Sequence, residues 1–348
     1  MGRYPDHPDR IRKRVPAVPQ IRKEVSVNQS IIELEGLTKN YGSFTAVDHL
    51  SLSVSGGEIF GLLGPNGAGK STTILMMIGL TEPSSGRVRV CGIDSTHNPA
   101  EVKKQVGYLP EDMGFYQELS GLENLVYTAR LNGVPETEAA AKAERMLGKV
   151  GLAGQGGKKT GNYSRGMRQR LGLADVLIKD PRVIILDEPT LGLDPEGVRE
   201  FLGLIVKLSR EEGLTVLLSS HHLHQIQQVC DRVGIFVGGK LIAEGDIQKL
   251  SAKLFAGEPF VVEAGLAFTA GNAAPAGQEQ LRASLEQLDG IVSVNGKGDL
   301  LRISCSRDIT PEIARLIVGS GIGLTYLHRK EYGLDDIYHR YFQEGREN

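Results

Sequence analysis

The chain has 348 residues, of which 40% are hydrophobic and 24% are charged, as in ordinary globular proteins. Forty basic and 42 acidic side chains leave a formal net charge of -2, which argues against binding of nucleic acid over the whole surface. No run of about 18 apolar residues occurs, and the first residues lack the apolar stretch of a secretory signal. We therefore expect a cytoplasmic protein that reaches a membrane only through a partner.

The first 30 residues form a polar leader that is rich in proline and basic side chains. Because this leader holds too few apolar residues to bury a core, its composition predicts disorder. The basic run 10–14 suits anionic lipid or nucleic acid, and the alternative is a solvated tail.

From Ile31 onward, short apolar runs alternate with longer stretches of helical periodicity, for example at 59–63, 183–186 and 215–218. Buried parallel strands joined by crossover helices produce this alternation. Two glycine turns, at 56–58 and 238–240, predict hairpins and thus an additional antiparallel layer. The pattern between residues 118 and 178 is almost entirely helical, which predicts an inserted helical subdomain.

After Leu250 the pattern changes to short strands and helices in the order β-α-β-β-α-β, which is the split unit of a ferredoxin-like fold. An amphipathic helix near the end places Leu334, Ile337, Tyr338, Tyr341 and Phe342 on one face. We expect strands at 260–266, 291–294, 300–305 and 324–327, and helices through 281–288 and 311–318.

A glycine-rich segment lies between a buried strand and a helix, which is where a phosphate-binding loop belongs. Its glycines allow backbone N–H groups to converge on phosphate oxygens, and the helix that follows directs its positive end there. Lys70 supplies a charge for the β- and γ-phosphates, and the Ser71 hydroxyl is a ligand for Mg²⁺. The segment matches G-x-x-x-x-G-K-[ST] and reads Gly64, Pro65, Asn66, Gly67, Ala68, Gly69, Lys70, Ser71 and Thr72.

A second apolar strand, Val183–Leu186, ends in the adjacent carboxylates Asp187 and Glu188. Ligand chemistry in open α/β sheets takes place at such strand ends. We expect Asp187 to hold Mg²⁺ through water and Glu188 to act as the general base on the attacking water.

Together these segments strongly resemble the ATP-binding subunits of ABC transporters, over about residues 31–250. The loop 64–72 matches Walker A, and 183–188 matches Walker B. Tyr41 matches the aromatic A-loop residue that stacks on adenine. The resemblance implies an α/β fold: a P-loop NTPase domain of the ABC type at 31–250, with a RecA-like core, an antiparallel β layer and a helical subdomain at about 112–178. A C-terminal α+β ferredoxin-like domain would then occupy 251–348.

Three further elements follow the family's order. The signature segment, residues 163–170, keeps the family's Ser164 and Gly166 but has Tyr163, Arg165 and Met167 where LSGGQ is usual. This variant resembles the branch common in bacterial ABC-2-type exporters. The resemblance implies that the signature contacts ATP held by the partner subunit, that Asp194 belongs to the D-loop, and that His221 contacts the γ-phosphate. The signature residues concerned are Ser164, Arg165, Gly166 and Met167.

The chain departs from the family at the Q-loop, where Glu111 stands in place of glutamine. A carboxylate can still reach Mg²⁺ or the lytic water, but it adds negative charge near the metal. By resemblance, the permease docks on 113–125, with Phe115, Tyr116 and Leu119 as candidate contacts. The alternative is that these three side chains pack the core of the subdomain.

The resemblance thus implies an ATPase that uses ATP and Mg²⁺ and works as a homodimer with an integral membrane permease, located at the inner face of the cell membrane. The catalytic residues would be Glu188, His221 and Lys70. One alternative is a soluble ABC ATPase acting on ribosomes or DNA, although the single nucleotide domain and the lack of a coiled-coil insertion disfavour nucleic acid as a partner. Another is an ATP-dependent regulator whose C-terminal domain binds a small molecule.

Overall fold

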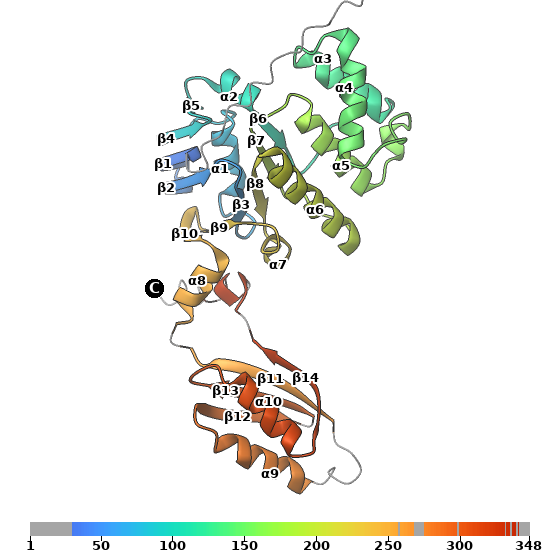
Figure 1. Cartoon of the computed structure of the whole chain (residues 1–348). Helices are drawn as coiled ribbons and strands as arrows, with labels where there is room; N and C mark the ends of the chain where they lie inside the picture. Colours follow the sequence, from blue (N-terminus) through green and yellow to red (C-terminus); the bar gives the residue numbers. More distant parts are fainter. Residues whose placement is uncertain are drawn as a thin grey trace, which may run out of the picture.

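The computed structural model describes most of the chain (Figure 1). The predicted leader lies outside the described residues except for Ser30, and so do Tyr341 and Phe342 of the predicted final helix. The described residues are 30–256, 258–267, 275–297, 299–330, 332–334, 336–338 and 340.

The centre of the molecule is a six-stranded sheet with the order β10-β9-β3-β8-β7-β6. Its pairs are parallel except for β9 and β10, and every residue of β3, β7 and β8 is buried. Continuous burial explains why these strands read as unbroken apolar runs. The strands are β3 (Ile59–Leu63), β6 (Val106–Leu109), β7 (Val183–Asp187), β8 (Thr215–Ser220), β9 (Arg232–Val237) and β10 (Lys240–Gly245).

A second, antiparallel sheet confirms the expected extra layer, with the order β2-β1-β4-β5. Its apolar side chains share a core with α1 and one face of the central sheet. The hairpin predicted at 238–240 is present between β9 and β10. The one predicted at 56–58 is wrong, because these residues carry the chain from β2 in one sheet to β3 in the other. The strands are β1 (Ser30–Tyr41), β2 (Phe44–Ser55), β4 (Ser85–Val90) and β5 (Ile93–Asp94).

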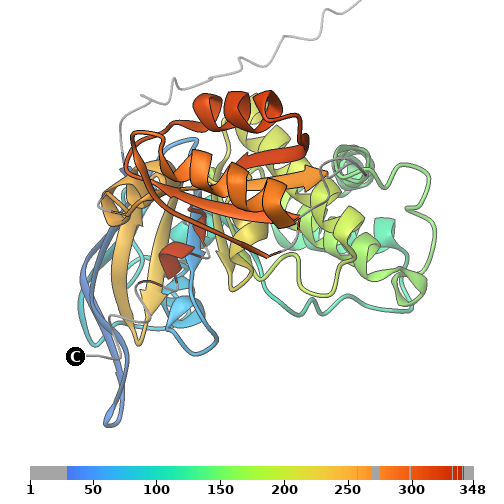
Figure 2. The ribbon, with the colours of Figure 1, turned by 90° about the horizontal axis from the view of Figure 1, so that it is seen from below.

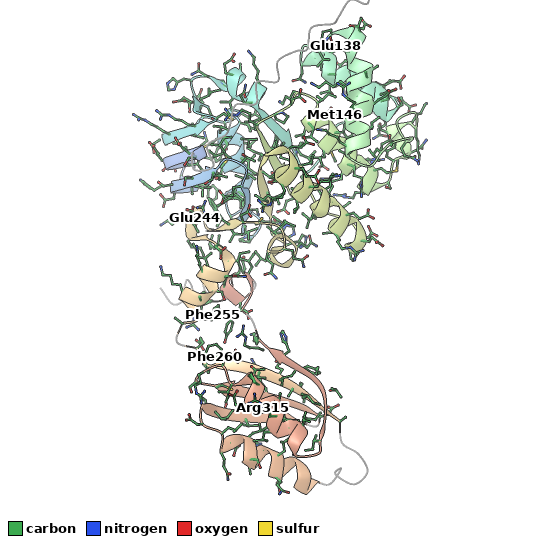
Figure 3. All side chains as sticks on the ribbon, viewed as in Figure 1. Glu138, Met146, Glu244, Phe255, Phe260 and Arg315 are labelled. Atoms are coloured by element: carbon green, nitrogen blue, oxygen red, sulfur yellow. The ribbon has the colours of Figure 1, made fainter. Side chains whose placement is uncertain are left out.

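Helices pack on the opposite face of the central sheet and form a second core, to which Met146 (Figure 3) belongs. Ser120 begins α3 with a capping box: its hydroxyl accepts from Glu123 N at 3.2 Å, and its own N–H donates to Glu123 Oε2 at 2.7 Å. No described helix is long and apolar enough to cross a membrane. The helices are α1 (Lys70–Met77), α2 (Pro99–Gln105), α3 (Gly121–Leu131), α4 (Glu136–Lys149), the 3-10 turn η1 (Thr160–Asn162), α5 (Arg165–Leu177), α6 (Pro195–Glu212), α7 (Leu223–Ile226) and α8 (Ile247–Leu254).

A third sheet, with the order β12-β13-β11-β14, has only antiparallel pairs and a core of its own. In the view from below (Figure 2), α9 lies in front of the strands, on the side away from the rest of the molecule. The element order is the predicted β-α-β-β-α-β. The elements are β11 (Phe260–Ala267), α9 (Pro275–Glu286), β12 (Ile291–Lys297), β13 (Leu300–Cys305), α10 (Thr310–Gly319) and β14 (Gly323–Arg329).

After β14 the chain returns to the nucleotide part of the molecule. Leu334 and Ile337 are fully buried in the helical core of the nucleotide part, not in that of the third sheet. Tyr332 stacks on Phe255, with ring centroids 4.0 Å apart, and Leu334 N donates to Gln227 Oε1 at 3.1 Å. Figure 3 marks Phe255 and Phe260, between which the chain passes from α8 to the third sheet. The domain boundary at residue 250 stays a prediction, but the third sheet is tied to the nucleotide part at both of its ends.

Candidate active site

The phosphate loop connects β3 to α1 and is shaped by close backbone packing. A Cβ on Gly64 would lie 2.3 Å from Phe236 O, and a Cβ on Gly69 would lie 2.4 Å from Ala46 O. Gly69 also has a φ of 101°, in the left-handed region that side chains disfavour. Gly64 and Gly69 are therefore required by neighbouring strands as well as by a phosphate ligand.

Lys70 begins α1 and is buried among oxygen atoms. Its Nζ donates to Gly64 O at 2.7 Å and to Pro65 O at 3.2 Å, and it lies 3.6 Å from Glu188 Oε1. Burial lowers the pKa of Lys70, while the charges of Glu188 and Asp187 oppose that shift. Both hydrogen bonds of the ammonium go to neutral carbonyl oxygens, and charged phosphate oxygens are stronger acceptors than these.

Glu188 follows β7 in a strained conformation, with a φ of 48° before Pro189. Its N–H donates to Ser219 O at 3.0 Å, which fixes the strand end against β8. Strain at a carboxylate that faces a buried lysine is typical of a functional position.

His221 comes directly after β8 and meets the same carboxylate. His221 Nδ1 lies 2.9 Å from Glu188 Oε1, and His221 N donates to Glu188 Oε2 at 3.4 Å. The close Nδ1–Oε1 contact is not aligned as a hydrogen bond, and both atoms are buried without another partner. The structure thus brings together Lys70, Glu188 and His221, three residues that are far apart in the sequence.

The residues expected at a magnesium ion fit that role in part. Asp187 Oδ1 is buried with no hydrogen-bond donor, as is the neighbouring Ser219 Oγ. Such an oxygen is suited to accept from a metal-bound water. Ser71 is exposed in the first turn of α1, and Glu111 is exposed after β6. No group of three or more His, Cys, Asp or Glu side chains that could hold a metal ion occurs in the described part of the chain.

Tyr41 ends β1 on the hairpin whose Ala46 O packs against Gly69. Its side chain is 50% exposed, and Lys39 Nζ lies 5.1 Å from the ring centroid. An exposed aromatic ring beside the phosphate loop is available for stacking on a base.

The signature segment starts α5. Ser164 Oγ accepts from Met167 N at 3.2 Å, which caps the helix, and Arg165 Nε donates to Leu191 O at 2.6 Å. Asp194 caps α6 by accepting from Gly197 N at 3.3 Å. These two helix starts border a surface hollow of about 450 Å³. No hydrogen bond or ion pair among the described residues joins this segment to the phosphate loop.

Several hydrogen bonds that hold the site in place could not be predicted from the sequence. Gly239 N donates to Ala68 O at 3.0 Å, Ser220 O accepts from Gly64 N at 3.3 Å, and Thr190 Oγ1 donates to Gln225 Oε1 at 2.9 Å. Burial and, to a smaller extent, the charge of Asp187 raise the pKa of Tyr108 to about 12. No local sequence pattern predicts these contacts, because they join segments that are distant in the sequence.

A glycine loop at a helix start, two carboxylates at the end of the neighbouring β7 and a histidine at the end of β8 define a P-loop ATPase. The family model for the ABC transporter matches residues 47–191. The chain is 46% identical to the uncharacterized ABC transporter ATP-binding protein YhcH of Bacillus subtilis, over 64% of this chain and 71% of that protein. It is 44% identical to the bacitracin transport ATP-binding protein BcrA of Bacillus licheniformis, over 62% of this chain and 69% of that protein.

Among solved structures, the chain resembles cbiO1 of Clostridium perfringens, part of the ABC transporter complex cbiONQ. The TM-score is 0.60 and the identity 27%, over 74% of this chain and 96% of that one. The chain therefore belongs to the ABC transporter ATP-binding proteins. It binds ATP and is an ATPase.

Proposed function

We propose that this chain hydrolyses ATP as a homodimer to drive export through a separate integral membrane permease, on the cytoplasmic face of the cell membrane. The contact of Glu188 with both Lys70 and His221 is the observation that carries the hydrolytic part. Support for export comes from the name of the bacitracin transport relative and from the signature variant with Tyr163 and Met167.

In this proposal, ATP takes the place of the carbonyl oxygens around Lys70. The backbone N–H groups of the phosphate loop and the start of α1 bind the β- and γ-phosphates, and Tyr41 stacks on adenine. Lys70 then stabilises the charge that the phosphates carry, because its ammonium is buried.

Glu188 is the proposed base. It takes a proton from the attacking water as the water oxygen bonds to the γ-phosphorus, and the bond from that phosphorus to the β–γ bridging oxygen breaks to give ADP and phosphate. His221 contacts the γ-phosphate, and its backbone N–H donates to Glu188 Oε2 at 3.4 Å, which keeps the carboxylate in place. Mg²⁺ bound with ATP would neutralise phosphate charge, and Asp187, Ser71 and Glu111 are the residues placed to hold it or its waters.

The signature segment is proposed to act on the ATP of a second copy. Its helix start is capped by Ser164 but open beyond Gly166, where an added Cβ would meet only Leu193 Cδ2 at 3.9 Å. A second chain can therefore bring its bound γ-phosphate against Ser164, Arg165, Gly166 and Met167, with Asp194 of the D-loop at the same interface.

The permease is proposed to dock on 113–125. Of the candidate contacts, Phe115 packs on the core of the helical subdomain, whereas Tyr116 is 54% exposed and free to meet a partner. The alternative of action on ribosomes or DNA depends on the basic run 10–14, which lies outside the described residues, and no observation of the structure favours it.

The test is affinity purification of the Glu188→Gln chain from gently solubilised native cells with ATP present. We expect a multi-span membrane protein in stoichiometric amount. The Lys70→Ala chain serves as the control, because it should not form the ATP-bound dimer. Recovery only from the soluble fraction, with ribosomes or nucleic acid attached, would contradict the transport proposal and leave the ATPase assignment standing.

A further inference from the structure

A pocket of about 260 Å³ lies between the end of β6, the segment 110–116 and the helices α3 and α5. Four aromatic side chains line it: Tyr108, Phe115, Tyr116 and Tyr127. Tyr116 and Tyr127 meet edge to face, with ring centroids 5.4 Å apart. The volume is smaller than that of typical sites for drug-sized ligands, which start at about 300 Å³, and it suits a single long side chain.

The pocket wall is held rigidly from behind by Asn124. This side chain is 3% exposed and accepts from Tyr116 N at 2.9 Å, while its Nδ2 donates to Tyr116 O at 3.1 Å. Because the backbone of Tyr116 is fixed by two hydrogen bonds, the aromatic wall is present before any ligand arrives. A rigid wall lowers the entropy cost of binding.

A carboxyl group with one oxygen that accepts no hydrogen bond also lines this pocket. Asp175 is on α5, and its Oδ1 is buried with no hydrogen-bond donor. Burial raises the pKa of Asp175, and a hydrogen bond with Thr128 and the charge of Lys179 oppose that shift only in part. Lys179, one turn further along, donates instead to Lys103 O at 2.6 Å, and no salt bridge to Asp175 exists in the described part of the chain.

A buried carboxylate oxygen that accepts no hydrogen bond is unfavourable, and a cation that enters the pocket and donates to this oxygen would relieve this. Aromatic faces attract the same cation through their negative π-surface. Four aromatic side chains around one carboxyl group therefore select a cationic head on an apolar stem, which is the chemistry of lysine and arginine.

We propose that this pocket receives one lysine or arginine side chain from a cytoplasmic segment of the membrane permease, with Asp175 as its counter-ion. The inference depends on the proposed function, which supplies the permease, whereas the choice of Asp175 comes from its unpaired oxygen. A protein is the favoured source of the cation because the pocket is continuous with the exposed Tyr116 on the proposed docking surface.

A photo-crosslinking amino acid in place of Tyr116 tests the inference in native membranes. We expect it to cross-link to a multi-span membrane protein, at a peptide that carries a lysine or arginine within a few residues of the link. Asp175→Asn should lower the cross-link yield at least about tenfold, since loss of one partner of a buried charge pair has a large effect on binding. It should leave the ATPase rate of the purified chain unchanged.

Asp180→Asn is the matched control. Asp180 lies five residues further along, is exposed and pairs with Lys142 at the surface, so its loss should leave the yield unchanged. Tyr127→Leu keeps the apolar wall but removes a π-face, and it should lower the yield about two- to fivefold.

The outcomes separate the two proposals. If the unmutated Asp175 chain cross-links to no membrane protein, both the permease proposal and this inference fail. If it does, but Asp175→Asn cross-links equally well, or the linked peptide has no basic residue, the assignment of Asp175 is overturned and the permease proposal stands.

Discussion

The phosphate loop and the signature segment are both helix starts suited to phosphate, yet the chain holds them in different ways. Around the phosphate loop, strands β2, β7, β8 and β9 supply direct contacts, and Lys70 is bonded to carbonyls and close to a carboxylate. Among the hydrogen bonds of the described residues, only the one from Arg165 Nε to Leu191 O joins the signature segment to the rest of the candidate site.

This difference indicates that one half of the site is preorganised within the chain, while the other half is completed by a second chain. Buried groups with fixed partners cost little to order when ATP arrives. An open helix start gains its function only at an interface. Substitutions in the first half should therefore act in the isolated chain, and those in the second half only in the dimer.

The largest effect is expected for Glu188→Gln, which removes the base but keeps the shape of the side chain. Turnover should fall about 10²- to 10⁴-fold, as for loss of a general base, while ATP binding is retained. The measurement is steady-state phosphate release together with nucleotide binding. Glu211→Gln, at an exposed position on α6, is the control. Hydrolysis at the wild-type rate would refute the role of Glu188.

Lys70→Ala should weaken ATP binding about 10²- to 10³-fold, because it removes a buried charge that the phosphates need. Equilibrium titration of the single chain with ATP measures this. Lys207→Ala, an exposed lysine on α6, should bind normally. An unchanged affinity in Lys70→Ala would show that the preorganised half is not the phosphate site.

Gly166→Asp should leave the fold and the ATP affinity of the isolated chain intact, because position 166 is open and an acidic residue favours a helix start. Turnover should fall about 10²-fold or more through repulsion from the partner's phosphate. Mixing this chain with the Lys70→Ala chain restores one complete site per mixed dimer, so turnover should rise on mixing. No rise at any ratio would contradict the shared site.

Tyr41→Ala should weaken ATP binding about tenfold, since stacking of a base on an aromatic ring contributes about 1–3 kcal/mol. Tyr41→Phe keeps the ring and should bind as the parent does. Equal binding by both variants would remove Tyr41 from the site.

The smallest effect is expected for Glu111→Gln. Glu111 is exposed and forms no salt bridge in the described part of the chain, so turnover should change by less than about fivefold. Phosphate release at saturating Mg-ATP measures it. A complete loss of turnover would show that the carboxylate itself is required at this position.

The phosphate loop, the carboxylates at the end of β7 and the order of elements in the third sheet could be predicted from the amino-acid sequence alone. These features follow from local chemistry: loop glycines, apolar runs and their spacing act over a few residues. His221 and Asp194 were found through the resemblance, because a single histidine or aspartate has no local signature.

Which residues meet across the fold could not be predicted, because these contacts depend on the packing of the whole chain. The turn at 56–58 has hairpin residues but joins two sheets, because the apolar faces of β2 and β3 belong to different layers. Phe115 and Tyr116 are alike in sequence, yet one packs inward and the other is exposed. Asp175 Oδ1 accepts no hydrogen bond, and Leu334 packs against the nucleotide part. Both outcomes depend on which residues lie opposite in the packed chain.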